Sequence, residues 1–165
     1  MKILIAEDDP LFRSLLAELL SPEFEVVISK DGVQARDILL QEHAPNMALL
    51  DWIMPEITGP QLCRELRAHA KTAGTYLILL TAKNDSADII AGLRAGADDY
   101  ITKPFVTEEL RARVRIGRRV LEMQATINSQ RDALEEAAGR EMELKTSIRV
   151  RAEVRLPEQA RHAKP

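Results

Sequence analysis

The chain has 165 residues, a formal net charge of −3, and 45% hydrophobic, 30% charged and 4% aromatic residues. Its length fits one domain of about 100–200 residues and argues against a two-domain enzyme, and its charge gives no sign of a polyanion-binding protein. The single cysteine, Cys63, excludes an intramolecular disulfide framework, and the apolar run 3–6 is too short for a signal peptide. We therefore expect a protein of the cytoplasm that makes no membrane contact.

The first part of the chain alternates short apolar runs with helical patterns. The apolar runs lack strict polar alternation, which is typical of strands covered on both faces. They occupy residues 2–6, 25–28, 47–50, 76–80 and 100–101, and helical patterns lie between them at 10–20, 32–42, 60–70 and 86–95. This alternation predicts an α/β fold with a doubly wound five-stranded parallel sheet, in which ligands gather beyond the carboxyl ends of the strands.

Local signals mark several helix ends. Asp9 is expected to cap the first helix rather than bind a ligand, and Pro10 suits a first helical position. Gly96 is expected to end the helix over 86–95. The first helix should present an apolar stripe to the core, formed by Leu11, Leu15, Leu16, Leu19 and Leu20.

The composition changes after Phe105. All six aromatic residues lie at or before this position, and residues 1–105 carry 10 Lys and Arg against 16 Asp and Glu, whereas residues 106–165 carry 13 against 10. An acidic, core-forming part thus precedes a basic extension. We expect a folded domain over 1–120, a helical extension over 121–148 and a disordered basic tail over 149–165.

The extension opens with a helix that has no stop signal. Thr107 is its expected N-cap, and acids follow in the first turn. Spacings of four and three residues then connect ten positions, eight of them apolar, which predicts a parallel dimeric coiled coil. These positions are Ile116, Val120, Met123, Ile127, Gln130, Leu134, Ala137, Glu141, Leu144 and Ile148. The two polar members interrupt the pattern, so a solvated single helix that frays is the alternative.

Polar side chains stand where the predicted strands end. Residues 7–9 (Glu-Asp-Asp) follow the first strand, Asp51 the third, Thr81 the fourth and Lys103 the fifth. Ionised carboxylates packed together need a cation, and oxygen ligands favour a hard one such as Mg²⁺. An aspartate at such a site can act as a nucleophile toward a phosphoryl group, while the metal and a lysine offset charge on the phosphoryl oxygens.

Four stretches make the chain resemble the receiver domains of two-component response regulators, the family that includes the single-domain chemotaxis regulator. They are ILIAEDDP, ALLDWIMPEITG, LILLTA and GLRAGADDYITKPF, and the resemblance covers residues 1–120. It implies a flavodoxin-like receiver fold and a phosphoacceptor switch that is not itself an enzyme. The implied partners are a sensor histidine kinase or a phosphotransfer protein, and an unknown downstream effector.

The resemblance also implies roles for particular residues. Asp51 would be the phosphoacceptor and, with Asp8, a direct Mg²⁺ ligand. Glu7 would act on the metal mostly through water, and Ile53 would supply a backbone carbonyl.

Three further residues would carry the switch. Thr81 and Lys103 would contact the phosphoryl group, and Tyr100 would change rotamer as the hydroxyl of Thr81 is drawn inward. The bond between Lys103 and Pro104 is commonly cis in this family. The movement would alter the face around the fourth and fifth helices and thereby bias the extension.

Several residues have plainer interpretations. Cys63 is expected to be a small buried hydrophobe, and Trp52 either a partly exposed contact residue or part of the core. His43, His69 and His162 lie apart from one another and from the strand ends, which disfavours a zinc or phosphohistidine site.

Other functions remain as alternatives. The chain could be the regulatory front of a longer output enzyme, such as a diguanylate cyclase or a phosphatase. Nucleic-acid binding is disfavoured, because no helix-turn-helix pattern or aromatic interleaving accompanies the basic tail. The basic tail residues are Arg149, Arg151, Arg155, Arg161 and Lys164. A flavin-binding protein of similar topology is disfavoured because no phosphate-binding loop follows the first strand.

Overall fold

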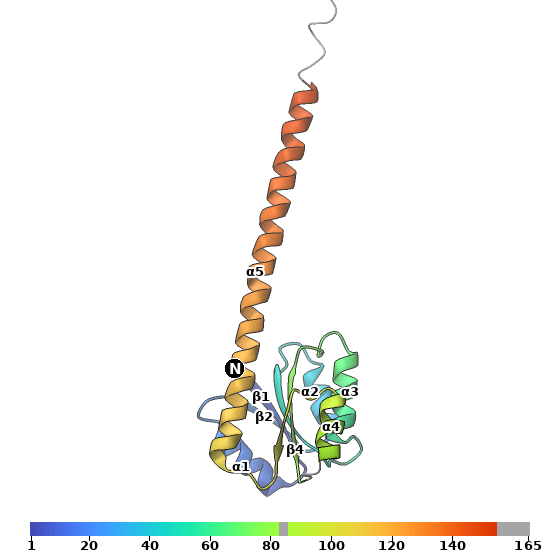
Figure 1. Ribbon diagram of the computed structural model, residues 1–165, viewed down its shortest axis with the longest axis vertical. Helices are drawn as coiled ribbons and strands as arrows, with labels where there is room; N and C mark the ends of the chain where they lie inside the picture. The colour runs from blue at the N-terminus through green and yellow to red at the C-terminus, as the bar shows by residue number, and fades with distance from the viewer. Residues whose placement is uncertain (83–85, 155–165) are drawn as a thin grey trace, which may run out of the picture. The chain divides into compact units, whose positions relative to one another are not determined.

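The computed structural model describes residues 1–82 and 86–154, with the backbone alone for 152–154. In this part of the chain strands and helices alternate (Figure 1). The strands are β1 (Lys2–Ala6), β2 (Glu25–Ser29), β3 (Met47–Asp51), β4 (Tyr76–Thr81) and β5 (Asp99–Thr102). The helices are α1 (Pro10–Leu20), α2 (Gly32–Leu39), α3 (Gly59–Ala68), α4 (Ser86–Arg94) and α5 (Thr107–Val154).

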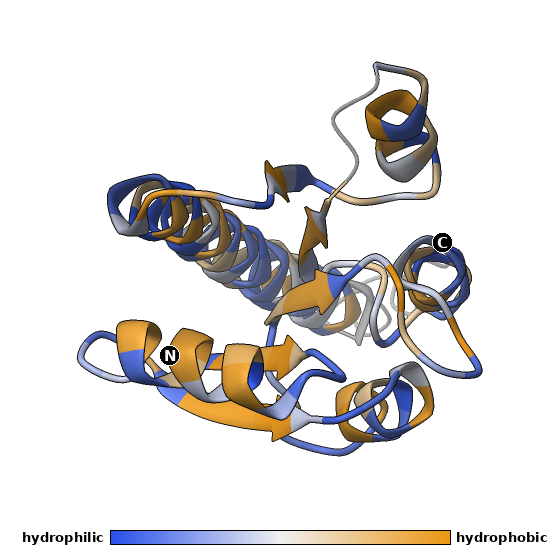
Figure 2. Cartoon of the chain, turned by 90° about the horizontal axis from the view of Figure 1, so that it is seen from below, coloured by the Kyte–Doolittle hydropathy of each residue, from blue (hydrophilic) through white to orange (hydrophobic). Residues whose placement is uncertain are grey.

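The strands form one parallel sheet in the order β2-β1-β3-β4-β5. This is the flavodoxin-like order, so the expected doubly wound five-stranded sheet is confirmed. Both faces of the central strands are covered, so these strands are apolar except at an end residue (Lys2, Asp51 or Thr81), and Figure 2 shows strands mostly in the hydrophobic colour.

Each face of the sheet has its own apolar core. On one face, α1 and the first turns of α5 contribute side chains such as Leu16 and Leu110. On the other face, α2 and α3 contribute residues such as Leu39 and Leu62, and Ala95 follows α4 into the same core. The two cores hold the sheet between two helical layers, which fixes the strand ends where polar residues gather.

The apolar stripe expected on α1 is partly wrong. Leu16 and Leu20 are buried, but Leu11 is 82% exposed and Leu15 is 46% exposed. The helix packs against the core through Leu16 and Leu20, and Phe12, Ala17 and Leu19 are partly buried beside them, because the side of a helix that lies on a sheet is the side it buries.

Several helix ends differ from the sequence prediction. The helix α2 ends at Leu39 rather than near residue 42. Thr107 lies inside α5, and the carbonyl of Val106 accepts hydrogen bonds from the first turn. The helix runs on to Val154, so the disorder expected from residue 149 is wrong for residues 149–154. The rest of the expected tail, 155–165, lies outside the described residues.

Other local predictions are confirmed. The Asp9 side chain accepts hydrogen bonds from the backbone N–H groups of Leu11 and Phe12 and caps α1. Gly96 follows α4 with a φ of 106°, a left-handed conformation that glycine adopts without steric cost.

The side chain of Trp52 is half-buried and packs against the core that includes α3. It also lies close to Gly92 of α4, where an added Cβ would stand 2.9 Å from the indole ring. The absence of a side chain at Gly92 thus lets α4 approach the residue that follows Asp51.

The chain divides into two compact units, Met1–Leu121 and Glu122–Pro165. The first contains the sheet and both cores. In the second, the described residues belong to α5, and their described side chains are exposed. Among the described helices, none has a stretch long and apolar enough to span a membrane.

Candidate functional site

Four strands deliver polar side chains to one edge of the sheet. Glu7 and Asp8 follow β1 directly, Asp51 ends β3, Thr81 ends β4, and Lys103 follows β5. The parallel register aligns these ends, because Ala6 pairs with Leu50 and Thr81 pairs with Thr102. A cleft of about 270 Å³ lies at this edge, lined by Glu7, Asp8, Asp51, Trp52, Ile53, Thr81, Ala82 and Lys103.

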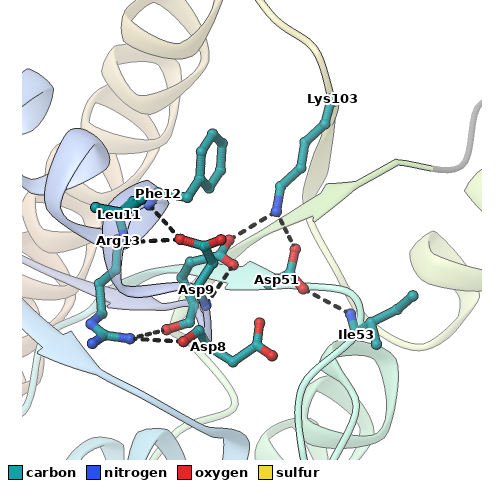
Figure 3. A network of polar contacts seen from close by, with 9 residues as sticks. Asp8, Asp9, Leu11, Phe12, Arg13, Asp51, Ile53 and Lys103 are labelled. Carbon is teal, nitrogen blue, oxygen red and sulfur yellow. Dashed lines mark hydrogen bonds and ion pairs between the residues drawn. The ribbon is translucent and has the colours of Figure 1, made fainter.

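Lys103 joins two carboxylates in this cleft (Figure 3). Its Nζ donates hydrogen bonds to Oδ1 of Asp51 at 2.5 Å and to Oε2 of Glu7 at 2.8 Å. The Glu7 and Asp51 side chains are buried, so these are charge-assisted contacts in a poorly solvated place. The ammonium group also lies 4.4 Å from the centre of the Phe12 ring, a cation–π contact.

The electrostatics of the pair follow from burial and charge. Burial raises the pKa of Glu7, and the negative charge of Asp51 raises it further. The hydrogen bond from Lys103 works in the opposite direction, but the pKa of Glu7 remains above its usual value. Burial works to lower the pKa of Lys103, but the hydrogen bonds and charges of Asp51 and Glu7 outweigh it, so this pKa is raised. Lys103 therefore stays charged, and the two carboxylates have a strong need for positive charge.

Three carboxylates could hold a metal ion. Oxygen atoms of Glu7, Asp8 and Asp51 lie within 4.8 Å of one another, and Asp8 is exposed while the other two are buried. Hard oxygen donors on one open side of a cleft suit Mg²⁺, which binds a few protein ligands and keeps several waters. The donor set present therefore fits this ion.

Hydrogen bonds that involve the backbone hold the acids in place. The N–H of Ile53 donates to Oδ2 of Asp51 at 3.0 Å, which places this loop beside the carboxylate. The guanidinium of Arg13 donates to the carbonyls of Glu7 at 2.7 Å and Asp8 at 3.3 Å. Figure 3 shows Arg13 reaching back from α1 to the loop that carries both acids.

The two remaining predicted residues have different positions. Thr81 is buried and lines the cleft, and its carbonyl accepts a hydrogen bond from the Lys103 N–H at 2.7 Å. Tyr100 does not line the cleft: it is half-buried on β5, and the guanidinium of Arg113 lies 5.7 Å from its ring centre. The Lys103–Pro104 bond is cis, as the resemblance implies.

Sequence reasoning missed two supporting residues. Phe12 and Arg13 contact the site, but they belong to α1, whose residues were considered only for packing and capping. The sequence does contain a usable signal. Arg13 lies four residues after the cap Asp9, and side chains in the first turn of a helix can reach the strand end that precedes the helix.

The model of the response regulator receiver domain family matches residues 3–115. The chain belongs to this family. It is 43% identical over 115 residues to the phosphate regulon transcriptional regulatory protein PhoB of Rhizobium meliloti, covering 69% of this chain and 50% of PhoB. It is 42% identical over 115 residues to the DNA-binding response regulator MtrA of Mycolicibacterium smegmatis, covering 69% of this chain and 49% of MtrA. This receiver thus spans about half the length of these relatives.

Solved structures of receiver domains also match this chain. The receiver domain of a sensor histidine kinase from Pseudomonas aeruginosa, which has a magnesium ion coordinated in its active-site cleft, is 32% identical with a TM-score of 0.63. The match covers 72% of this chain and 94% of that one. This chain is therefore a signal-transduction receiver of two-component systems, with an acidic group at the edge of the sheet where receivers bind Mg²⁺.

Proposed function

We propose that this receiver accepts a phosphoryl group on Asp51 from a sensor histidine kinase or a phosphotransfer protein. Glu7, Asp8, Asp51 and the backbone carbonyl of Ile53 would hold Mg²⁺. The proposal depends above all on one observation, the contact of the Lys103 ammonium with the buried Asp51 carboxylate. It places a fixed positive charge beside the expected nucleophile.

The chemistry is a substitution at phosphorus. A carboxylate oxygen of Asp51 attacks the phosphorus, a P–O bond forms, and the bond between phosphorus and the donor breaks, its electron pair leaving with the donor. Bound Mg²⁺ would supply positive charge that offsets the charge of the phosphoryl oxygens. Lys103 supplies a second positive charge, and the hydroxyl of Thr81 donates a hydrogen bond to the new phosphoryl group.

The signal would leave the site through Thr81 and Tyr100. Movement of Thr81 toward the phosphoryl group opens space that the Tyr100 ring can enter. Because Tyr100 stands on β5 and contacts Arg113 of α5, its movement alters the surface formed by α4, β5 and the first turns of α5. We assign this chain the role of a phosphoacceptor switch without an enzymatic output, which controls its helical connector or a partner.

Labelling with a radioactive small acyl phosphate and Mg²⁺ tests the proposal. Wild type should take up label, and Asp51→Ala should take up none. Asp9→Asn is the matched control, because asparagine also caps a helix and Asp9 belongs to the same acidic run without joining the three clustered carboxylates. Persistent labelling of Asp51→Ala would refute the assignment.

A second arm tests the metal. Asp8→Asn should weaken Mg²⁺ binding, and so raise strongly the Mg²⁺ concentration that labelling requires, since it removes an exposed carboxylate of the clustered three. Equal Mg²⁺ dependence in Asp8→Asn and Asp9→Asn would contradict the proposed ligand set.

DNA contact is a second candidate, because the relative MtrA is named a DNA-binding regulator. The candidate residues in the described part of the chain are Arg149 and Arg151 of α5. Binding of duplex DNA at moderate salt, lost in a variant with both arginines changed to alanine, would support it. The sequence argues against such binding, because it has no helix-turn-helix pattern and no aromatic residues among the basic ones.

A further inference from the structure

The second unit carries an exposed apolar face with a heptad repeat. Between residues 123 and 148 every first and fourth heptad position is solvent-exposed, and six of the eight are apolar. A helix that buries none of its apolar residues gains no stability from packing, and isolated helices are only marginally stable in water. The first positions are Ile127, Leu134, Glu141 and Ile148, and the fourth positions are Met123, Gln130, Ala137 and Leu144.

We propose that this face, residues 123–148 of α5, pairs with a second copy of the chain as an antiparallel coiled coil in which Glu141 meets the partner's Gln130. The occupant follows from self-complementarity. In an antiparallel pair each first position faces a fourth position of the other helix. One register pairs all eight positions and leaves none over, and in that register the two polar residues face each other.

The polar pair is chemically suitable. The Gln130 amide has two N–H donors, and the Glu141 carboxylate accepts them. Glu141 is already held by the ammonium of Lys145 at 2.6 Å, one turn further along the helix. The pair occurs twice in a symmetric dimer, so each Glu141 carboxylate has an amide donor from the partner and a nearby cation in Lys145.

The apolar pairs fit by size in the same register. Leu134 faces the partner's Ala137, so a large side chain meets a small one at the centre of the seam. Ile127 faces the partner's Leu144, and Ile148 faces the partner's Met123. Facing large and small residues fills the space between helices without voids.

A parallel pair is less favourable, which revises the orientation expected from the sequence pattern. In register, it would place Glu141 against the partner's Glu141 and Ala137 against the partner's Ala137. The flanking positions would place Arg140 beside the partner's Lys145. Like charges in apposition cost free energy, and facing alanines leave a gap. The antiparallel pair has none of these conflicts.

The oligomeric state of the full chain tests the occupant. The side chains of Leu134 and Met142 are similarly exposed, at 70% and 68%. Leu134 is a first heptad position of the proposed seam, whereas Met142 follows a first position and lies off the seam. Arginine keeps the helix propensity in both places. In sedimentation equilibrium, wild type and Met142→Arg should be dimers and Leu134→Arg a monomer. A monomeric wild type, or two variants that behave alike, would overturn the proposal.

Disulfide trapping tests the orientation. Ile127→Cys and Leu144→Cys are oxidised separately and as a mixture, with wild type as control because its Cys63 is buried. The antiparallel register predicts a cross-link in the mixture alone. Cross-linking of each variant with itself indicates a parallel pair and overturns the register. Neither measurement involves phosphorylation, so this inference and the proposed function fail independently.

Discussion

Two regions of the molecule reverse the usual distribution of polar and apolar side chains, and they do so in opposite directions. At the edge of the sheet, the charged side chains of Glu7, Asp51 and Lys103 are largely buried. On α5 beyond residue 121, large apolar side chains such as Leu134 and Ile127 are exposed. Buried charge and exposed apolar surface are the two departures that point to function in a folded protein.

The two regions differ in whether the chain itself supplies a partner for the unusual side chains. The sheet edge contains its own cation, Lys103, so its charges are compensated within one chain. The apolar face of α5 has no such internal partner among the described residues. The edge should therefore be stable in a monomer, whereas the properties of the helix should depend on protein concentration.

Removing the internal cation should give the largest effect. Lys103→Met leaves Glu7 and Asp51 buried without a positive partner. Breaking a buried ion pair from one side costs about 3–5 kcal/mol, and we expect about 3 kcal/mol here because Lys103 is partly exposed. Chemical denaturation at neutral pH without Mg²⁺ measures this loss in the free energy of unfolding.

The pH dependence of that loss has a defined sign. Burial and the Asp51 charge raise the pKa of Glu7, and removal of Lys103 takes away the contact that opposes them. The cost of ionising Glu7 in the folded state is present above its raised pKa and disappears as the pH falls through it. The stability difference between variant and wild type should narrow on acidification and on addition of Mg²⁺. A difference that neither treatment changes would contradict compensation by Lys103.

Two glycines of α5 separate its packed part from its solvated part. At Gly117 an added Cβ would stand 2.6 Å from the Tyr76 ring, whereas at Gly139 nothing lies within 4 Å. Gly117→Ala should destabilise the chain by about 1–3 kcal/mol through overpacking. Gly139→Ala should stabilise the helix by about 1 kcal/mol through propensity. Thermal melts followed by circular dichroism measure both, and changes of the same sign would contradict the distinction.

A charge placed on the seam sharpens the proposed pairing. Gln130→Lys puts an ammonium opposite the partner's Glu141 in an antiparallel pair, but opposite another ammonium in a parallel one. We expect the dimer dissociation constant to fall about tenfold, which corresponds to about 1.4 kcal/mol. Asn128→Lys, two positions away and off the seam, is the control and should change little. A weaker dimer for Gln130→Lys would indicate the parallel arrangement.

The smallest effect concerns the buried thiol of Cys63. Burial raises the pKa of Cys63 to about 12, so its thiol stays neutral. Iodoacetamide at neutral pH should leave Cys63 unmodified in the folded chain and modify it after denaturation, as mass spectrometry can show. Rapid modification of the folded protein would mean that the α3 core opens readily.

The sheet was predictable because its apolar strands end at polar residues. An apolar run that stops at Asp51 or Thr81 marks both the end of a strand and a residue at the carboxyl edge. The extent of α5 was less predictable, since residues 149–154 carry no heptad repeat and helix continuation there depends on propensity alone.

The site was predictable where it follows from strand order. Asp51 and Lys103 stand 52 residues apart, and parallel pairing brings their side chains into contact. The position of Phe12 against Lys103 and the bonds from Arg13 depend on how α1 rests on the sheet, which no local pattern specifies. For the same reason the sequence did not predict that Phe12 is partly buried while Leu11 and Leu15 are exposed.

The close approach of Gly92 to Trp52 gives the molecule an optical reporter. Trp52 is the only tryptophan of the chain and follows Asp51 directly, with its ring against α4. The indole emission therefore reports on the surroundings of the phosphoacceptor without an added dye. Binding of an ion beside Asp51, or a shift of α4, should change the intensity of that emission in a titration of the unmodified protein.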